Sequence, residues 1–458
     1  MNRLLEKVFT NRGYTKEYLE SINVSDHGLL KDIDLLSERL YDIYTKQTHI
    51  VVLPDFDMDG IMSGVIGFAG LAELGFNVSL FIPDPKKGYG FDAKTISDII
   101  SKYPDVGAII TCDVGISDIQ GTDAAVLAGI EVLVTDHHKQ DVINKNASVI
   151  VNPMRLDESY ENPAICGAYV LHQCLQYYAN KYCDVFTKEQ INRLRVFAGI
   201  GTVSDSMPIL YENRQLVKDA ISICRLVYSD SSDFIINNIV GSDIYRRAFR
   251  GLYNVLVVFE ELGKISSYHD ITEDLFGYYM APIFNSVKRL DGDLQKAFDV
   301  FFGVYSVESV HYLVELNELR KELVAKKYAE LYNTDQPFKP YAYISDAPAG
   351  ILGLLAQRIM ADTGLPALVL NQEGKKYKGS GRCPMWYPFL DRVKPEGFWA
   401  AGHNPAFGVG FTDKNELEAF LAFLERDVSD LYKELDLDKV TYEPDFIIAT
   451  DGSGDTNI

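Results

Sequence analysis

The chain has 458 residues, more than a single hydrophobic core usually fills, so its length favours two or three domains. Hydrophobic residues make up 47% and charged residues 24%, a composition that excludes a disordered or fibrous protein. The formal net charge of -21 excludes a broadly basic surface that coats nucleic acid. Any positive charge that meets a polyanion must therefore be local.

The six cysteines are scattered and form no CxxC pair, so we expect reduced core residues rather than disulfides or a zinc site. The N-terminal stretch MNRLLEKVFTNRGYTKEY is too polar for a signal peptide. No apolar run reaches the length that a membrane span needs. These features predict a cytoplasmic protein with no membrane contact.

The first half of the chain alternates apolar strands with helix-length segments. Residues 1–45 have helical spacing and predict an N-terminal helical segment. The run HIVVLP then predicts a strand, followed by a small-residue helix that ends at Gly75. The same alternation continues through VSLFIP, GAIITCDVG, EVLVTDHH and SVIVNP. Fully apolar strands are typical of a parallel sheet covered on both faces, so residues 46–240 are predicted to form an α/β domain.

The pattern becomes helical after about residue 215 and then returns to α/β. We predict a helical connector over residues 241–337, in which residues 306–333 form one long helix. A smaller α/β domain is predicted over 338–430 from YAYIS, the helix ILGLLAQRIMADTG, ALVLN, a basic turn and the helix ELEAFLAFLERD. The tail, 431–458, ends in the composition of a frayed terminus.

Acidic side chains follow the first predicted strand in the motif PDFDMDG. Asp55, Asp57 and Asp59 alternate there, and three carboxylates this close repel one another unless cations neutralise them. A solvated acidic loop and a calcium loop are the alternatives. An EF-hand needs a flanking helix, and the strand before Asp55 excludes it.

Three further motifs add ligand-type side chains. TCDVG contributes Asp113, TDHH contributes Asp136, His137 and His138, and GTVSDSMP contributes Asp205 at the close of an apolar stretch. Singly, a strand-end Asp is more often a helix cap. Because we expect all four motifs at strand ends along one sheet edge, they predict a metal site. Carboxylates with one or two histidines suit Mn²⁺ or Mg²⁺ better than structural Zn²⁺.

In order and content, DFDMDG, CDVG, DHH and GTVSD resemble the DHH phosphoesterase superfamily, and GSGRCP and AAGHNPAFG resemble its DHHA1 motifs. The resemblance covers roughly residues 45–425. The third Asp of the first motif and the segment APIFNSVKRL are similar to the RecJ branch, single-strand-specific 5′-to-3′ exonucleases. This resemblance implies a DHH domain joined by the long helix to a DHHA1 domain, with the active site in the cleft between them.

The resemblance also implies roles for individual residues. Two divalent cations, Mn²⁺ or Mg²⁺, would be held by the predicted metal ligands Asp55, Asp57, Asp59, Asp113, His137 and Asp205. The catalytic residues would be Asp113, which bridges the cations, Asp136, which orients a histidine, and His138, which faces the scissile phosphate. Substrate-binding residues would be Arg382, His403, Ser380, Gly381, Asn285, Arg289 and Ser63. A basic run, Lys375, Lys376 and Lys378, is equally consistent with a solvated hairpin turn and with DNA contact.

The chain departs from the family pattern in the second domain. AGHNPAFG replaces a glycine-rich GGHxxAAG, and Cys383 stands where serine is usual. RecJ enzymes usually carry an OB-type domain after the second domain, and only about thirty residues remain here. The predicted partners are therefore single-stranded DNA or short oligonucleotides, with a single-strand-binding or helicase protein as a possible source of processivity.

Two alternative functions are compatible with the same fold. One is a DHH enzyme for short oligonucleotides or cyclic dinucleotides, a branch that usually uses an upstream histidine as ligand. His49 lies at the start of the first strand, about 20 Å from its end at the rise of a strand, and Asp59 is present, which favours RecJ. The other is a catalytically inactive scaffold, which the complete set of ligands disfavours.

Overall fold

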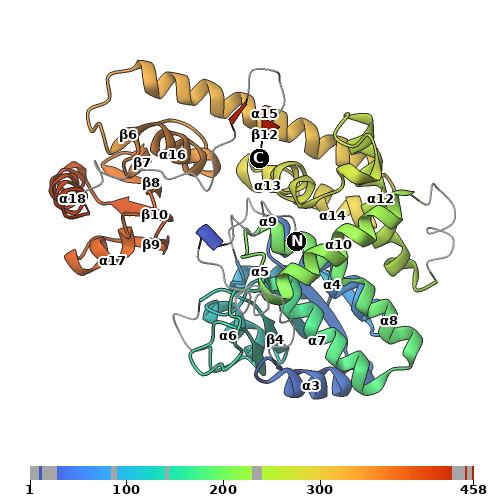
Figure 1. The fold of residues 1–458 in the computed structure, drawn as a ribbon. Helices are drawn as coiled ribbons and strands as arrows, with labels where there is room; N and C mark the ends of the chain where they lie inside the picture. Colours follow the sequence, from blue (N-terminus) through green and yellow to red (C-terminus); the bar gives the residue numbers. More distant parts are fainter. Residues whose placement is uncertain are drawn as a thin grey trace. The chain divides into compact units, whose positions relative to one another are not determined.

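The computed structural model describes residues 10–12, 28–83, 90–139, 144–229, 240–435, 449–450 and 456–457. The chain divides into two compact units, one spanning Glu20–Asn317 and the other containing Glu318 and the residues after it. The division falls inside α15 (Ser306–Asn333), which confirms the single long helix predicted for this range (Figure 1). Each unit combines helices with a five-stranded sheet, so the α/β class is confirmed. The domain boundaries proposed from the sequence stay predictions.

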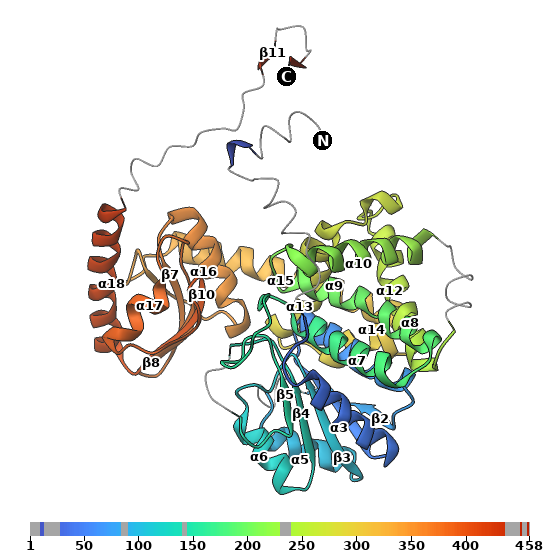
Figure 2. The same ribbon diagram turned by 60° about the horizontal axis from the view of Figure 1, so that its bottom comes forward.

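The first unit is built on a parallel sheet in the order β2-β1-β3-β4-β5. All five strands were predicted, and their bounds are β1 His49–Pro54, β2 Val78–Leu80, β3 Val106–Cys112, β4 Glu131–Thr135 and β5 Val149–Val151. Every residue of β1 is buried, because helices cover both faces (Figure 2). Ile50 and Val52 join the core with α4 (Met58–Glu73) and α7 (Gly167–Tyr182). Val51 and Leu53 join the core with α5 (Ala93–Lys102) and α6 (Ile119–Leu127).

The strand order creates a topological switch point between β1 and β3. The chain passes from β1 to β2 on one side and then returns to β3 on the other. Ligands of open α/β sheets bind beyond the carboxyl ends of the strands at such a point. Asp55 follows β1 directly, Asp113 follows β3, and Asp136 follows β4. The fold therefore brings three of the predicted motifs to one edge.

The fourth motif ends a helix and not a strand, so its predicted strand-end position is wrong. Asp205 is the C-cap of a helix, α9 (Arg195–Ser204). The apolar run that precedes it is buried from Val196 to Thr202, and a short continuous apolar run cannot be told from a buried strand by its sequence. Its glycines allow close packing: a Cβ on Gly199 would lie 2.7 Å from the Leu216 carbonyl oxygen of the neighbouring helix, α10 (Tyr211–Ser229).

Helices complete the first unit, and those that follow residue 215 lie in the region predicted to be helical. They are α3 (Ile33–Thr45), α8 (Val185–Arg193), α12 (Asp243–Glu261), the π-helix η3 (Leu275–Met280), α13 (Ala281–Arg289) and α14 (Leu294–Phe302), with a short 3-10 turn, η2 (Tyr268–Asp270). Of the predicted N-terminal segment, residues 1–9 and 13–27 lie outside the described residues. α13 packs against α4, which carries the segment FNSVKR to the first motif.

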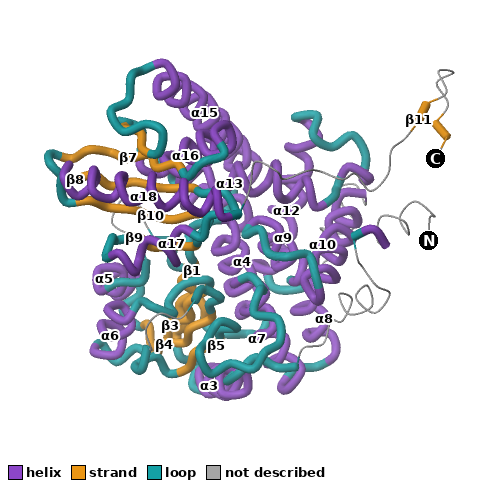
Figure 3. Tube along the Cα trace, turned by 60° about the vertical axis from the view of Figure 1, so that its left-hand side comes forward, coloured by secondary structure: helices purple, strands orange, loops and turns teal. Residues whose placement is uncertain are grey.

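The second unit contains a mixed sheet in the order β6-β7-β8-β10-β9 (Figure 3). Its elements are β6 (Ala342–Ile344), α16 (Ala349–Thr363), β7 (Ala367–Glu373), β8 (Lys376–Arg382), α17 (Phe389–Val393), η4 (Lys394–Glu396), β9 (Ala400–His403), β10 (Ala406–Phe411) and α18 (Lys414–Glu434). The predicted strands and helices are confirmed. The basic turn is shorter than predicted, because Lys376 and Lys378 pair within β8 and only Lys375 stays in the turn.

Other expectations concern the tail and the cysteines. Ala449–Thr450 and Thr456–Asn457 pair as β11 and β12, and the rest of the tail after residue 435 lies outside the described residues. All six cysteines are free, and five of them are buried, as predicted. Within the described ranges, the search for a helix long and apolar enough to cross a membrane finds none.

Candidate metal centre

The first motif forms a tight loop between β1 and α4. Asp57 is the N-cap of α4, and its Oδ1 accepts hydrogen bonds from the amides of Asp59 (3.1 Å) and Gly60 (3.2 Å). Gly60 is required by space, because a Cβ there would lie 2.5 Å from the carbonyl oxygen of Asp55. The loop therefore holds three carboxylates within one turn of chain.

Asp59 is fixed by a second helix. Its side chain is only 2% exposed, and its carboxylate accepts hydrogen bonds from the first amides of α7, those of Gly167 (2.7 Å) and Ala168 (3.2 Å). The positive end of a helix dipole stabilises an anion in this position. α9 closes the other side: a Cβ on Gly201 would lie 2.4 Å from Asp59 Oδ1.

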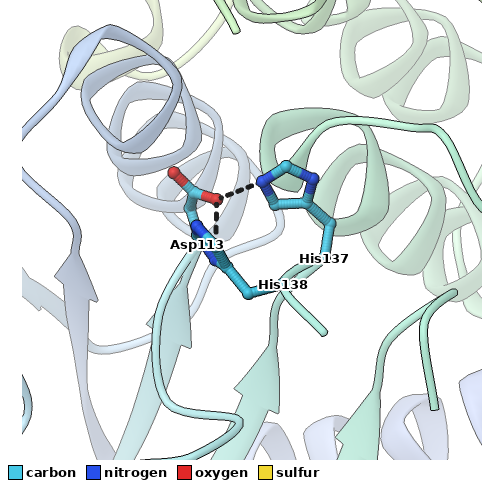
Figure 4. Close-up of side chains that lie close together, drawn as sticks. All are labelled: Asp113, His137 and His138. Atoms are coloured by element: carbon cyan, nitrogen blue, oxygen red, sulfur yellow. Dashed lines mark ion pairs between the residues drawn. The ribbon is translucent and has the colours of Figure 1, made fainter. Parts of the chain in front are cut away.

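Asp113 is buried at the centre of the site. It adopts a left-handed backbone conformation with φ 65°, and it is 1% exposed. Its Oδ1 lies 3.1 Å from His137 Nε2 and 4.0 Å from His138 Nδ1 (Figure 4). Among the described residues none donates a hydrogen bond to this oxygen, and His137 faces it as an ion-pair partner. A buried carboxylate oxygen without a donor is what a cation ligand requires.

The two histidines have different partners. His137 Nε2 faces the carboxylates, at 3.1 Å from Asp113, 3.6 Å from Asp205 and 3.9 Å from Asp59. His138 instead places Nδ1 2.8 Å from Asp136 Oδ1, and its side chain is 51% exposed. Asp136 also accepts the backbone amide of His137 at 2.7 Å. His138 is thus the histidine hydrogen-bonded to Asp136, whose role as an orienting residue stays a prediction.

The carboxylates and histidines fall into groups that could each hold a cation. The atoms of each group lie within 4.8 Å of one another, and the groups are Asp55 with Asp57 and Asp113, Asp59 with His137 and Asp205, and Asp113 with His137 and His138. All donors are oxygen or imidazole nitrogen, the set that suits Mn²⁺ and Mg²⁺. The residues present therefore fit a pair of divalent cations, and Asp113 belongs to two of the three groups.

Charge repulsion within this site changes the protonation of its side chains. Burial, followed by the charge of Asp57, raises the pKa of Asp55 to about 7. Burial and the charge of Asp59 raise the pKa of Asp205 to about 7 and that of Asp113 well above its ordinary value. Without cations, the carboxyl groups of Asp55 and Asp205 are therefore partly protonated near pH 7. Bound cations would reverse the effect, because they favour the charged form.

Asp136 and His138 show the opposite pattern. Burial alone would raise the pKa of Asp136, but the hydrogen bond and charge of His138 outweigh it and lower the pKa below its ordinary value. The same hydrogen bond raises the pKa of His138 to about 9. His138 is therefore protonated at neutral pH in the cation-free protein, with its positive charge next to the carboxylates.

A cavity of about 260 Å³ opens beside the first motif, between α4, the end of α9 and α13. Asn285 lines it and accepts the backbone amide of Met58 at 2.8 Å, which braces the start of α4. Lys288 also lines it, with Nζ 4.0 Å from Asp57 Oδ2 and 4.3 Å above the ring of Phe56. Sequence reasoning missed Lys288, although its place beside Arg289 in FNSVKR could have indicated it. Arg289 lines the same cavity.

Ser63 and His49, which the sequence analysis singled out, form hydrogen bonds with other residues of the first unit. Ser63 is fully buried, and its hydroxyl donates to the Asp59 carbonyl at 2.8 Å. Its contact with substrate stays a prediction, and the present bond supports the first motif. His49 has one ring nitrogen 3.0 Å from Asp105 and the other 2.9 Å from Ser79 Oγ. It is therefore engaged at the opposite end of β1 from the carboxylates.

The predicted phosphate-binding residues of the second unit lie on β8 and β9. Arg382 ends β8, and its Nη1 donates to the Gly381 carbonyl at 2.7 Å. Ser380 pairs with Gly408 of β10, and His403 lies in β9. Sheet packing by itself requires glycine at position 381, because a Cβ there would lie 2.1 Å from the ring of Phe407. This requirement is independent of any ligand.

Comparison with known proteins shows what this fold and site are similar to. Residues 49–198 match the family described as "DHH family, N-terminal domain". The similarity to the RecJ branch extends further. The single-stranded-DNA-specific exonuclease RecJ of Bacillus subtilis is 25% identical over 435 residues, which cover 91% of this chain and 49% of that protein. The protein of the same name from Dickeya dadantii is 26% identical, over 83% of this chain and 66% of that protein.

A solved structure shows the same fold. RecJ of Thermus thermophilus in complex with Mn²⁺ superimposes with a TM-score of 0.71 at 22% sequence identity, over 93% of this chain and 59% of that one. The chain thus spans about half to two thirds of the length of these relatives. The fold similarity covers both units.

Proposed function

We propose that this protein is a RecJ-like 5′-to-3′ exonuclease that hydrolyses single-stranded DNA to mononucleotides with two divalent cations. The observation that carries the proposal is the convergence of six Asp and two His side chains on the switch point of the sheet, in the spacing of the DHH family. Relatives named as single-stranded-DNA-specific exonucleases align over most of the chain, which supports this substrate.

For the cations, we assign Asp55, Asp57 and Asp113 to one site and Asp59, His137 and Asp205 to the other. Asp113 would be shared, because it belongs to the first group and its Oδ1 lies 3.1 Å from His137 Nε2 of the second. The complex of Thermus thermophilus RecJ with Mn²⁺ supports Mn²⁺ as the cation, and the ligand atoms suit Mg²⁺ as well. When bound, such cations lower the pKa of a coordinated water and neutralise charge on a phosphate.

Protein groups around these sites would contact the scissile phosphate. His138 is half-exposed and hydrogen-bonded to Asp136, so in its protonated form it would donate a hydrogen bond to a phosphate oxygen, and Asp136 would orient its ring. Lys288 and Arg289 line the cavity beside Asp57 and would bind the neighbouring phosphates. In a chain with a net charge of -21, these cationic groups give the local positive field that a polyanion needs.

In the second unit, we propose that Arg382, Ser380, Gly381 and His403 hold the backbone of the strand. A cytoplasmic location and a single-strand-binding or helicase partner are also proposals. Such a partner would add a second contact with long DNA and so raise the effective affinity.

The function is tested by digestion of a long single strand labelled at its 5′ or its 3′ end, in Mn²⁺, beside a duplex and a dinucleotide. Early release of the 5′ label as a mononucleotide, with the duplex intact, is the expected result. Hydrolysis of the dinucleotide alone would assign the protein to the small-substrate branch. Absence of any hydrolysis would support the inactive scaffold.

The Asp113→Asn variant is the matched control, because it keeps the shape of the side chain and removes its charge. We expect hydrolysis to fall by at least about 10³-fold. Activity close to that of the unchanged protein would contradict the shared role of Asp113.

A further inference from the structure

The sheet of the second unit has one face that helices cover only in part. Alternate residues of β10 belong to the core that α17 and α18 close, namely Phe407, Val409 and Phe411. The residues between them point to the opposite face: Ala406, Gly408 and Gly410. α16 packs on β7 and β8, and a Cβ on its Gly353 would lie 2.8 Å from Nη2 of Arg382, which pairs with Ala406. α16 therefore lies on this second face, on the side of β7 and β8.

Over β9 and β10 the second face is accessible down to the main chain. Apart from the chain neighbours of Gly408, the described residues bring only two atoms within 4 Å of a Cβ placed there. Both are carbonyl oxygens of adjacent strands, those of Gly379 (3.8 Å) and Ala401 (3.9 Å). Ala401 itself is exposed. A ligand can therefore lie directly on the strands at this place, which we call the open face.

A large aromatic side chain borders the open face. Trp399 directly precedes β9 and is 55% exposed. A Cβ on Gly410 would lie 3.5 Å from Trp399 Cε3, so the indole ring lies over the open face and not on the side of the core. The other tryptophan of the chain, Trp386, packs instead against Tyr432 of α18, with ring centroids 5.7 Å apart. Aromatic rings next to a surface that tracks a backbone are typical stacking partners of nucleic-acid bases.

Cationic side chains project from the same face. The antiparallel register pairs Lys378 with Gly410 and Arg382 with Ala406, so both side chains leave β8 on the side of the Trp399 ring. Lys378 is exposed. The two cations lie four residues apart on β8, roughly 13 Å at the rise of a strand, so they would meet different phosphates. An aromatic ring beside such cations is the combination that binds single-stranded nucleic acid.

We propose that Trp399 is a base-stacking residue and that the open face holds a segment of single-stranded DNA. One base lies on the indole ring, and the backbone runs over Gly408 and Gly410 towards Lys378 and Arg382. The inference rests on the proposed function, because it presupposes a single-stranded substrate. It adds a contact with the bases to the contacts with the backbone. Stacking accepts every base, so this contact should not depend on sequence.

Binding of labelled strands to the full chain, measured by fluorescence anisotropy in EDTA to prevent hydrolysis, tests the proposal. An oligothymidylate is compared with an abasic strand of the same length, which keeps the phosphates and lacks the bases. We expect Trp399→Ala to weaken binding of the oligothymidylate about tenfold and to leave the abasic strand unchanged. Trp399→Phe keeps a ring and should retain most of the affinity. Trp386→Phe is the matched control and should change neither strand.

Two further variants report on the open face itself. Trp386→Phe leaves Trp399 as the only tryptophan of the chain, so its fluorescence should be quenched by the oligothymidylate and not by the abasic strand. Gly408→Val fills the open face, and its Cβ would have no described neighbour closer than 3.8 Å outside its own strand, so the sheet should accept it. We expect this variant to weaken the binding of both strands.

The outcomes separate the stacking role from the proposed function. An equal loss of affinity for both strands in Trp399→Ala, or no loss for either, would overturn the stacking role. In the second case the unchanged protein would still bind and digest single strands, so the proposed function would stand. If the unchanged protein bound neither strand in EDTA, the open face would not be a binding surface, and only digestion in Mn²⁺ would still support the nuclease. Absence of both would overturn the two proposals together.

Discussion

Gly201 of α9 makes room for the carboxylate of Asp59, and the substitution Gly201→Ala tests this. The added Cβ would lie 2.4 Å from Asp59 Oδ1 and 3.1 Å from the Cβ of Ala168. Ordinary contact begins at 3.4 Å, so the carboxylate must move by roughly 1 Å. That movement strains both hydrogen bonds from the first amides of α7.

The magnitude follows from these contacts. Hydrogen bonds to a charged group contribute roughly 1.5–3 kcal/mol each, and alanine regains about 1 kcal/mol of helix propensity, so the net loss is about 2–5 kcal/mol. A displacement of 1 Å in a catalytic site can cost about 10²-fold in rate. We therefore expect Gly201→Ala to weaken Mn²⁺ binding and to lower hydrolysis by about 10²-fold.

Calorimetric titration with Mn²⁺ and a single-strand digestion assay measure both effects. Gly277→Ala is the matched control, because its Cβ would approach only a methyl group of Val203, at 3.3 Å. If Gly201→Ala bound Mn²⁺ and cleaved DNA like the unchanged protein, Asp59 would not depend on the space that this glycine leaves. Contacts with α7 and α9 would then not fix the position of the Asp59 carboxylate.

Three further outcomes are expected. Asp136→Asn should lower the pKa of His138 from about 9 toward its ordinary value, because it weakens the hydrogen bond that stabilises the charged ring. An NMR titration of the cation-free protein measures this pKa, and an unchanged midpoint would show that the hydrogen bond does not set it. The raised pKa values of Asp55 and Asp205 stabilise the cation-free fold at low pH, and this contribution is lost as the pH rises through about 7. In EDTA the protein should therefore melt at a higher temperature at pH 6 than at pH 8. Added Mn²⁺ should raise the melting temperature more at pH 8 than at pH 6. A higher melting temperature at pH 8 in EDTA would contradict the raised pKa values. Lys288→Met should raise the KM for single strands about tenfold and reduce its salt dependence, and an unchanged KM would remove Lys288 from the phosphate path.

Much of the fold and of the site follows from local sequence patterns. The apolar strands identify a covered parallel sheet, and a motif that directly follows such a strand must lie at its carboxyl edge. The sequence alone therefore brings Asp55, Asp113 and Asp136 together. The long helix over 306–333 was equally predictable, because its length and charge spacing are local properties.

Only the tertiary structure decided which contacts form between segments far apart in the chain. Asp205 reaches the site from a buried helix whose sequence resembles a strand, and Lys288 reaches it because α13 packs beside α4. The different roles of His137 and His138 are also invisible in sequence, since adjacent side chains diverge according to the partners that surround them. The physical reason is the same in each case: hydrophobic periodicity fixes local elements, whereas packing fixes the distances between them.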